Sequence, residues 1–271
     1  PLVFSDGQVN AFSIASDRPG GFSTDDLGYI YEIIPVLSRL IEMHYVRRTA
    51  VTLLDTYLGH QTGERVLDGL VKRGDGEDIH AVIWFCDLRN STSLSESMQR
   101  TAYLEMLNQF LEAMADSVSE AGGEVLRFIG DAALAIFPIG EHDHAARCEA
   151  TGRAVAAARQ AVRRMRALND ERSADGLDEI GYGIGLHLGD VTYGNIGSES
   201  RLEFTVIGPA ANEAARIENM TKALDRPVIM SEEFRRCFPD TLVSLGRHSL
   251  RGIADEHELF TLPDAAFDGR A

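Results

Sequence analysis

The alternation of hydrophobic and polar positions predicts a mixed α/β domain. An apolar run, Ala81–Cys86, has the length and composition of a buried strand. The stretch from about Gln99 to Glu120 repeats apolar residues at three-and-four spacing, which predicts a helix. Two further strand-like runs, Gly123–Ile129 and Ala132–Phe137, are separated by Gly130-Asp131. This dipeptide predicts a tight hairpin, because Gly supplies the positive φ of the first central position.

The rest of this region predicts a long helix, three strands, a helix that begins at Pro209, and a closing group of short elements. Pro is tolerated in the first turn of a helix. The β-α-β-β-α-β order of the first half predicts a ferredoxin-like α+β fold, with a mostly antiparallel sheet flanked by helices. The later elements are helix 144–169, strands 180–188, 190–196 and 202–207, helix 209–222, strand 228–230, helix 231–238, and strands 242–250 and 256–262.

The first 78 residues have the pattern of a leader made of a hairpin and helices. Asp6-Gly7 predicts the hairpin, and Ser23 or Thr24 is a candidate N-cap of a helix. Further helical runs are predicted over 46–58 and 63–71. One face of the first helix is apolar, which predicts either a parallel two-helix connection over 24–72 or an ordinary amphipathic helix folded on its own domain. That face comprises Leu27, Ile30, Ile34, Leu37 and Ile41.

These patterns divide the chain into four parts. Residues 1–22 form a hairpin, residues 23–78 signalling or dimerisation helices, residues 79–263 the main domain, and residues 264–271 a C-terminal tail. The hairpin, its turn and the exit helix resemble the end of a GAF-like sensory domain followed by a signalling helix. Because the chain begins at Pro1 without Met, we expect a fragment of a longer protein with a sensory domain upstream.

Composition narrows the classes of partner. The 271 residues are 44% hydrophobic, enough to bury a core, and no apolar run reaches transmembrane length. The formal net charge of −16 argues against nucleic acid or an anionic membrane as partner. Three widely spaced cysteines without a CxxC pair are typical of reduced thiols in a cytoplasmic protein.

Two carboxylates are the first candidates for chemistry. Asp87 ends the apolar run 81–86, and Asp131 occupies the tip of the predicted hairpin. If the run pairs beside the hairpin, both carboxylates meet at one edge of the sheet. Hard oxygen ligands that leave room for substrate phosphates suit Mg²⁺. The alternative is that each is a solvated turn residue.

Three motifs resemble those of a known enzyme family. They are FCDLRNSTSL, VLRFIGDAALAIF and YGNIGSESRLEFTVIGPAANEAARIE. From about Ile79 to Pro263 the chain resembles a bacterial class III adenylate/guanylate cyclase catalytic domain. The resemblance implies that Asp87, Asp131 and the backbone carbonyl of Leu88 bind metal.

The resemblance also assigns candidates to catalysis and substrate binding. Asn212 would orient the ribose, and Arg216, four residues later on the same helical face, would stabilise the transition state. Arg127 and Thr205 fall where the family reads the purine, and Arg251 falls where a basic residue holds the terminal phosphates. Asn90, Ser91 and Thr92 stand where the family often has Gly-Phe-Thr. Asn tolerates positive φ well, so the phosphate-binding turn is expected to survive.

The activity implied is cyclisation of ATP to 3′,5′-cyclic AMP and pyrophosphate, with two Mg²⁺ per site and Mn²⁺ as a substitute. The site would lie at a homodimer interface, with the metals from one chain and Asn212, Arg216 and the purine contacts from the other. Arg127 and Thr205 differ from the residues typical of guanine recognition, which favours ATP over GTP.

Three other readings remain open. The chain could be a guanylate cyclase, or a catalytically silent cyclase-like module that binds nucleotide or only dimerises. Gly122-Gly123-Glu124 resembles the signature turn of a diguanylate cyclase, but that reading leaves Asn212 and Arg216 unexplained. His187 is interpreted as a core or edge histidine in preference to a ligand.

Overall fold

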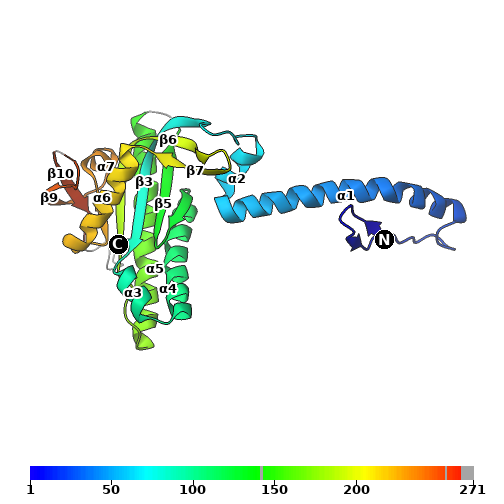
Figure 1. The fold of residues 1–271 in the computed structure, drawn as a ribbon, viewed down its shortest axis with the longest axis horizontal. Coiled ribbons are helices and arrows are strands. Elements are labelled where there is room, and N and C mark those ends of the chain that lie inside the picture. The colour runs from blue at the N-terminus through cyan, green and yellow to red at the C-terminus, as the bar shows by residue number, and fades with distance from the viewer. Residues whose placement is uncertain (141–142, 254, 264–271) are drawn as a thin grey trace. The chain divides into compact units, whose positions relative to one another are not determined.

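The structure of the protein is a computed structural model, which describes residues 1–140, 143–253 and 255–263. The predicted tail 264–271 lies outside the described residues. The chain divides into two compact units, residues 1–67 and residues 68–271, and Figure 1 shows the elements of each. Each unit is taken by itself.

The first unit contains a small hairpin and two helices. Strands β1 (Leu2–Val3) and β2 (Val9–Asn10) pair antiparallel, as Asp6-Gly7 predicted. Helix α1 (Thr24–Leu58) begins at Ser23, whose hydroxyl accepts from the Asp26 N–H while Asp26 accepts from the Ser23 N–H. Helix α2 (His60–Leu67) follows. The Ser38 hydroxyl of α1 donates to the Val3 carbonyl at 2.9 Å, which fixes the hairpin against the helix.

In the second unit, the described residues form an eight-stranded sheet in the order β4-β5-β3-β6-β8-β10-β9, with β7 paired to β6. Neighbouring strands are antiparallel except β6 and β8. The strands are β3 (Gly76–Leu88), β4 (Glu124–Ile129), β5 (Ala132–Ile139), β6 (Tyr182–Ser198), β7 (Arg201–Ile207), β8 (Val228–Met230), β9 (Val243–Ser249) and β10 (Glu256–Thr261).

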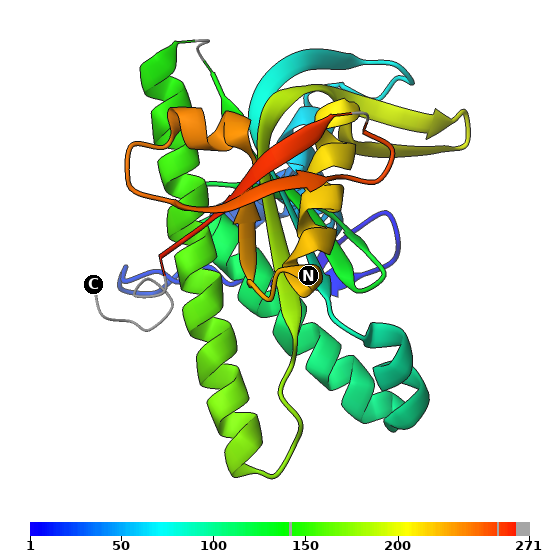
Figure 2. The same ribbon diagram turned by 90° about the vertical axis from the view of Figure 1, so that its left-hand side faces the viewer.

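Helices cover both faces of the sheet, because successive side chains of its central strands are buried on opposite faces. Val82 and Trp84 of β3 join the core formed with α4 and α5, whereas Ala81 and Ile83 join the core formed with α6. Figure 2 shows α6, in yellow, running along the sheet. The helices are α3 (Ser91–Ser97), α4 (Arg100–Glu120), α5 (His144–Ala174), α6 (Pro209–Ala223) and α7 (Glu232–Cys237).

The predicted fold class is confirmed. The elements β3, α4, β4, β5, α5 and β6 follow the β-α-β-β-α-β order, and the spatial order β4-β5-β3-β6 is that of a ferredoxin-like sheet. None of the helices in the described ranges is both long and apolar enough to cross a bilayer.

Several predicted lengths are wrong. The strands predicted at 180–188 and 190–196 are one strand, β6, because β3 pairs with it continuously and places Ala81 opposite Gly189. The helical runs predicted up to Ile41 and over 46–58 are one helix, α1, since no turn residue interrupts them. Helix α5 continues five residues past the predicted end at residue 169, to Ala174.

Candidate active site

The fold brings Asp87 and Asp131 together. Asp87 lies near the end of β3, in register with Ala132 of β5, and Asp131 is the residue before Ala132 in the hairpin. Gly130 has the positive φ, 66°, that the tight turn needs. Burial raises the pKa of Asp87 to about 6, with further contributions from the charge of Asp131 and a hydrogen bond with it. The pair is therefore a half-buried dicarboxylate, which differs from two solvated turn residues.

The backbone around Asp87 is fixed by local hydrogen bonds. The Leu88 N–H donates to Asp87 Oδ1 at 2.8 Å, and Leu88 is the last residue of β3. Asn90 then adopts the left-handed conformation, with φ 60°, as expected for the residue in place of Gly. Ser91 and Thr92 open the short helix α3. The Lys222 ammonium donates to Asn90 Oδ1 at 2.9 Å, which connects this turn to the end of α6.

Glu218 is a third carboxylate of this site, and sequence reasoning missed it. It is 5% exposed on α6. Burial raises its pKa to about 7, with a further contribution from the charge of Asp87. A local signal existed, because Glu218 falls four residues after Ala214 and one after Ile217, on the buried face of the helix. A carboxylate at such a position needs a partner or an ion.

Asn212 and Arg216 lie together on the first turns of α6, at a separate surface cavity. This cavity has a volume of about 540 Å³, and Gly252 and Ile253 line it beside the two residues. A Cβ built on Gly252 would lie 3.6 Å from Arg216 Nη2, so the turn that carries the exposed Arg251 is adjacent to this guanidinium. Asp87 and Asp131 are not among the residues that line this cavity.

Arg127 and Thr205 come from two strands, β4 and β7, that lie near each other. Arg127 Nη1 donates to Glu203 Oε1 at 2.8 Å. Glu203 and Thr205 share one face of β7, because side chains alternate along a strand. Thr205 is 4% exposed, and within the described part of the chain its hydroxyl has no hydrogen-bond partner. Glu203 is thus an ion-pair partner of Arg127, and the sequence did not predict this contact.

One described chain therefore brings the predicted residues together in three groups. The aspartates gather at the end of β3, Asn212 and Arg216 beside the turn of Arg251, and Arg127 near Thr205.

Residues 77–262 match the family described as "Adenylate and Guanylate cyclase catalytic domain". The chain belongs to this family. Cyclase domains of this family use divalent metal ions. The predicted family is confirmed, and the matched range includes every predicted site residue.

Relatives with known names agree with this assignment. The chain is 39% identical over 170 residues to an adenylate cyclase of Anabaena cylindrica, and the match covers 61% of this chain and 32% of that protein. The first curated relatives are matched over only 27–33% of their own length. The chain therefore spans about a third of the length of these relatives.

Solved structures share the fold. A bacterial light-regulated adenylyl cyclase has a TM-score of 0.69 at 23% identity, covering 86% of this chain and 65% of that one. The guanylyl cyclase Cya2 has a TM-score of 0.59 at 27% identity, covering 70% and 95%. The first likeness shows a shared fold, and the two named activities differ, so these structures do not select a purine for this chain.

Proposed function

We propose that this chain is an adenylate cyclase, which converts ATP to 3′,5′-cyclic AMP and pyrophosphate at an interface between two copies. The observation that carries the proposal is the juxtaposition of Asp87 and Asp131 in a domain of the cyclase family. The charge of Asp131 adds to burial in raising the pKa of Asp87, and a divalent cation would offset the repulsion between the two carboxylates.

The donor set fits Mg²⁺. Asp87 and Asp131 offer hard carboxylate oxygens at the end of β3, and burial together with the charge of Asp131 raises the pKa of Asp87. When bound, the metal supplies charge neutralisation at the phosphates and favours ionisation of the ribose 3′-hydroxyl. Mg²⁺ would be held by Asp87, Asp131 and the Leu88 carbonyl, with Mn²⁺ as a substitute.

The other residues position the nucleotide and stabilise charge. Arg216 would donate to the oxygens around the α-phosphorus, where the planar guanidinium matches the geometry better than a Lys ammonium. Asn212, one turn earlier on α6, would hold the ribose so that the 3′-oxygen attacks in line with the leaving pyrophosphate. Arg251 would bind the terminal phosphates, and Asn90, Ser91 and Thr92 would donate to them from the turn after β3.

ATP is proposed as the substrate in preference to GTP. Arg127 offers donors, and the buried hydroxyl of Thr205 has spare hydrogen-bonding capacity, which suits the edge of adenine. The name of the Anabaena relative supports this choice. GTP stays the second candidate because the likeness to Cya2, named a guanylyl cyclase, is at 27% identity.

The test is a product assay on the purified chain. Incubation with Mg²⁺ or Mn²⁺ and either ATP or GTP should give cyclic AMP and pyrophosphate from ATP, with a lower kcat/KM for GTP. Asp87→Asn should abolish turnover, whereas Asp116→Asn, at an exposed position of α4, should not. Cyclic GMP as the main product would contradict the substrate, and no cyclic nucleotide under any of these conditions would contradict the activity.

A further inference from the structure

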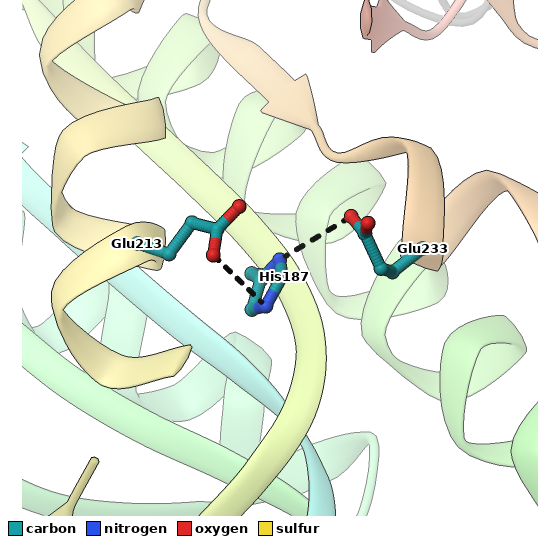
Figure 3. Close-up of side chains that lie close together, drawn as sticks. All are labelled: His187, Glu213 and Glu233. Atoms are coloured by element: carbon teal, nitrogen blue, oxygen red, sulfur yellow. Dashed lines mark ion pairs between the residues drawn. The ribbon is translucent and has the colours of Figure 1, made fainter. Parts of the chain in front are cut away.

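His187 lies at the centre of a second polar cluster, on the strand that α6 and α7 both approach. Its side chain is 6% exposed. Its Nε2 is 3.7 Å from Glu213 Oε2 on α6, and its Nδ1 is 3.9 Å from Glu233 Oε2 on α7. Figure 3 shows the imidazole between the two carboxylates. His187 is buried, as its interpretation as a core histidine predicted, and two acids lie beside its ring.

The cluster has more negative charge than its own hydrogen bonds compensate. Oε1 of Glu213 and Oε2 of Glu233 are buried and have no hydrogen-bond partner in the described part of the chain. Buried carboxylate oxygens without donors are costly unless a cation is present. Burial lowers the pKa of His187 even though both glutamates act to raise it, which favours the neutral imidazole.

A neutral imidazole cannot satisfy both acids. It has one N–H and one lone pair, and each ring nitrogen faces a carboxylate oxygen. His187 Nδ1 also lies 3.0 Å from the hydroxyl of Ser231, which accepts the Phe234 N–H at the start of α7. With the Ser231 hydroxyl donating to Nδ1 and the Nε2–H directed at Glu213, the imidazole has no donor left for Glu233 Oε2, and a cation would supply the missing counter-charge.

We propose that His187, Glu213 and Glu233 form a second metal site, which binds a divalent transition metal such as Zn²⁺ and is separate from Asp87 and Asp131. One ligand atom from each residue lies within 4.8 Å of the other two. The ligand atoms of a four-coordinate Zn²⁺, with bonds of about 2.0–2.1 Å, lie closer to one another than 4.8 Å. Rotation of the two flexible glutamate side chains would bring the carboxylate oxygens within bonding distance of the ion. The set of one imidazole and two carboxylates favours Zn²⁺ over Mg²⁺, which takes oxygen ligands.

A further histidine lies beside the first carboxylate. His257 Nδ1 of β10 lies 3.4 Å from Glu213 Oε1, the position that an outer-shell partner of a metal-binding carboxylate occupies. Glu213 follows Asn212 in α6 and lines the same cavity as Arg216. A metal ion at the cluster would therefore join β6, α6 and α7. It would also hold α6, the helix that carries Asn212 and Arg216, in place.

The test uses the full chain in an Asp87→Asn background, which removes the metal-binding pair of the active site. Protein stripped with a chelator is titrated with Zn²⁺ by calorimetry, and its thermal unfolding is followed. We expect one tight equivalent per chain and a rise in Tm. Adding Glu233→Gln should weaken Zn²⁺ binding by more than about tenfold, the loss that even an outer-shell partner can cause, and should remove the rise in Tm.

Glu232→Gln is the matched control. Glu232 and Glu233 are neighbours on α7 with side chains 37% and 39% exposed, but Glu232 pairs with Arg236. Glu232→Gln should keep the full equivalent of Zn²⁺. Equal Zn²⁺ binding by the two variants would overturn the proposal. A Tm that changes with pH but not with any added transition metal would also overturn the proposal. The groups that face His187 are Glu213, Glu233, His257 and His80, and this result would mean that a protonated His187 supplies the positive charge among them.

Discussion

Asp87 is a carboxylate that the fold holds where its charge is unfavourable. Its pKa rises from 3.8 to about 6, first through burial and then through Asp131. Since the folded state binds its proton more tightly than the unfolded state, the contribution of Asp87 is favourable at low pH and is lost as the pH rises from about 4 to 6. Above pH 6 the metal-free protein has the full cost of the ionised pair.

Asp87→Asn should therefore stabilise the metal-free protein above pH 6. Because the residue is half-buried and partly screened by solvent, we expect a gain on the order of 1 kcal/mol in the free energy of unfolding. Urea denaturation at pH 4 and pH 7.5 measures it, and the gain should appear only at pH 7.5. Mg²⁺ should raise the Tm of the wild type more than that of the variant.

The exposed Asp116→Asn serves again as the control, with no pH-dependent gain. Equal stability of Asp87→Asn and the wild type at pH 7.5 without metal would show that the ionised Asp87 carboxylate is not unfavourable in the folded protein. Equal stabilisation of both by Mg²⁺ would show that Asp87 holds no metal.

Which residues could be predicted depends on how local their signal is. Asp87 and Asp131 each follow directly from a strand or a turn in the sequence, so their meeting could be inferred from strand pairing alone. Glu218 could not be linked to Asp87, because that contact depends on how α6 crosses the sheet. The pairing of Glu203 with Arg127 depends on the contact of β4 with β7, which are separated in the chain by β5, α5 and β6.

At the scale of elements, the packing of α6 against β6 controls where Asn212 and Arg216 lie. Gly185 of β6 permits this contact, because a Cβ there would lie 2.5 Å from the Ala214 carbonyl oxygen and 2.5 Å from the Glu218 nitrogen. Backbone atoms on a helix cannot move aside individually, so any side chain at this position must shift α6 as a whole.

Gly185→Ala should thus destabilise the protein by roughly 1–3 kcal/mol through overpacking and should lower kcat by displacing Asn212 and Arg216. Gly152→Ala in α5 is the matched control, since a Cβ added there would have nothing within 4 Å. That change should stabilise the protein by about 0.4–1 kcal/mol. Urea denaturation and the product assay measure both effects, and an unchanged kcat in folded Gly185→Ala would separate the position of α6 from catalysis.

Element type was predictable along most of the chain, whereas element length was not. The sequence signals at Gly189-Asp190 are those of a turn, but pairing with β3 on one side keeps β6 extended through them. The polar start of β3 at Gly76 has no hydrophobic pattern of its own and is a strand only because β6 pairs with it. Tertiary contacts decided both boundaries.

At the scale of the whole molecule, α1 has an apolar face other than the one predicted. The predicted face at Ile34, Leu37 and Ile41 is partly buried, and the hairpin contacts α1 at Ser38. A neighbouring stripe is 49–67% exposed, and its residues recur at three-and-four spacing, as in a two-helix seam. The stripe comprises Tyr29, Ile33, Val36, Leu40 and Met43.

If the leader dimerises, Leu40→Glu should weaken self-association. Burial of one such side chain contributes about 1.5–3 kcal/mol, so the dissociation constant should rise roughly ten- to a hundredfold. Sedimentation equilibrium measures it. Thr49→Glu, on the opposite side of α1, is the matched control and should leave association unchanged. Equal association of both variants would exclude this stripe as the contact.

A shared active site requires that residues of two copies act together. Asp87→Ala and Arg216→Ala chains should each be inactive as homodimers, with Arg216→Ala losing on the order of 10²-fold or more in kcat. In a hybrid dimer, one site has both defects, but the other combines intact aspartates with an intact Arg216 from its neighbour. Random exchange at equal concentrations makes half of the dimers hybrids, so about a quarter of wild-type activity should return.

Product formation after mixing measures the recovered activity, with the unmixed variants as controls. If subunits exchange and no activity returns, then each chain completes its own site with its own Asp87 and Arg216.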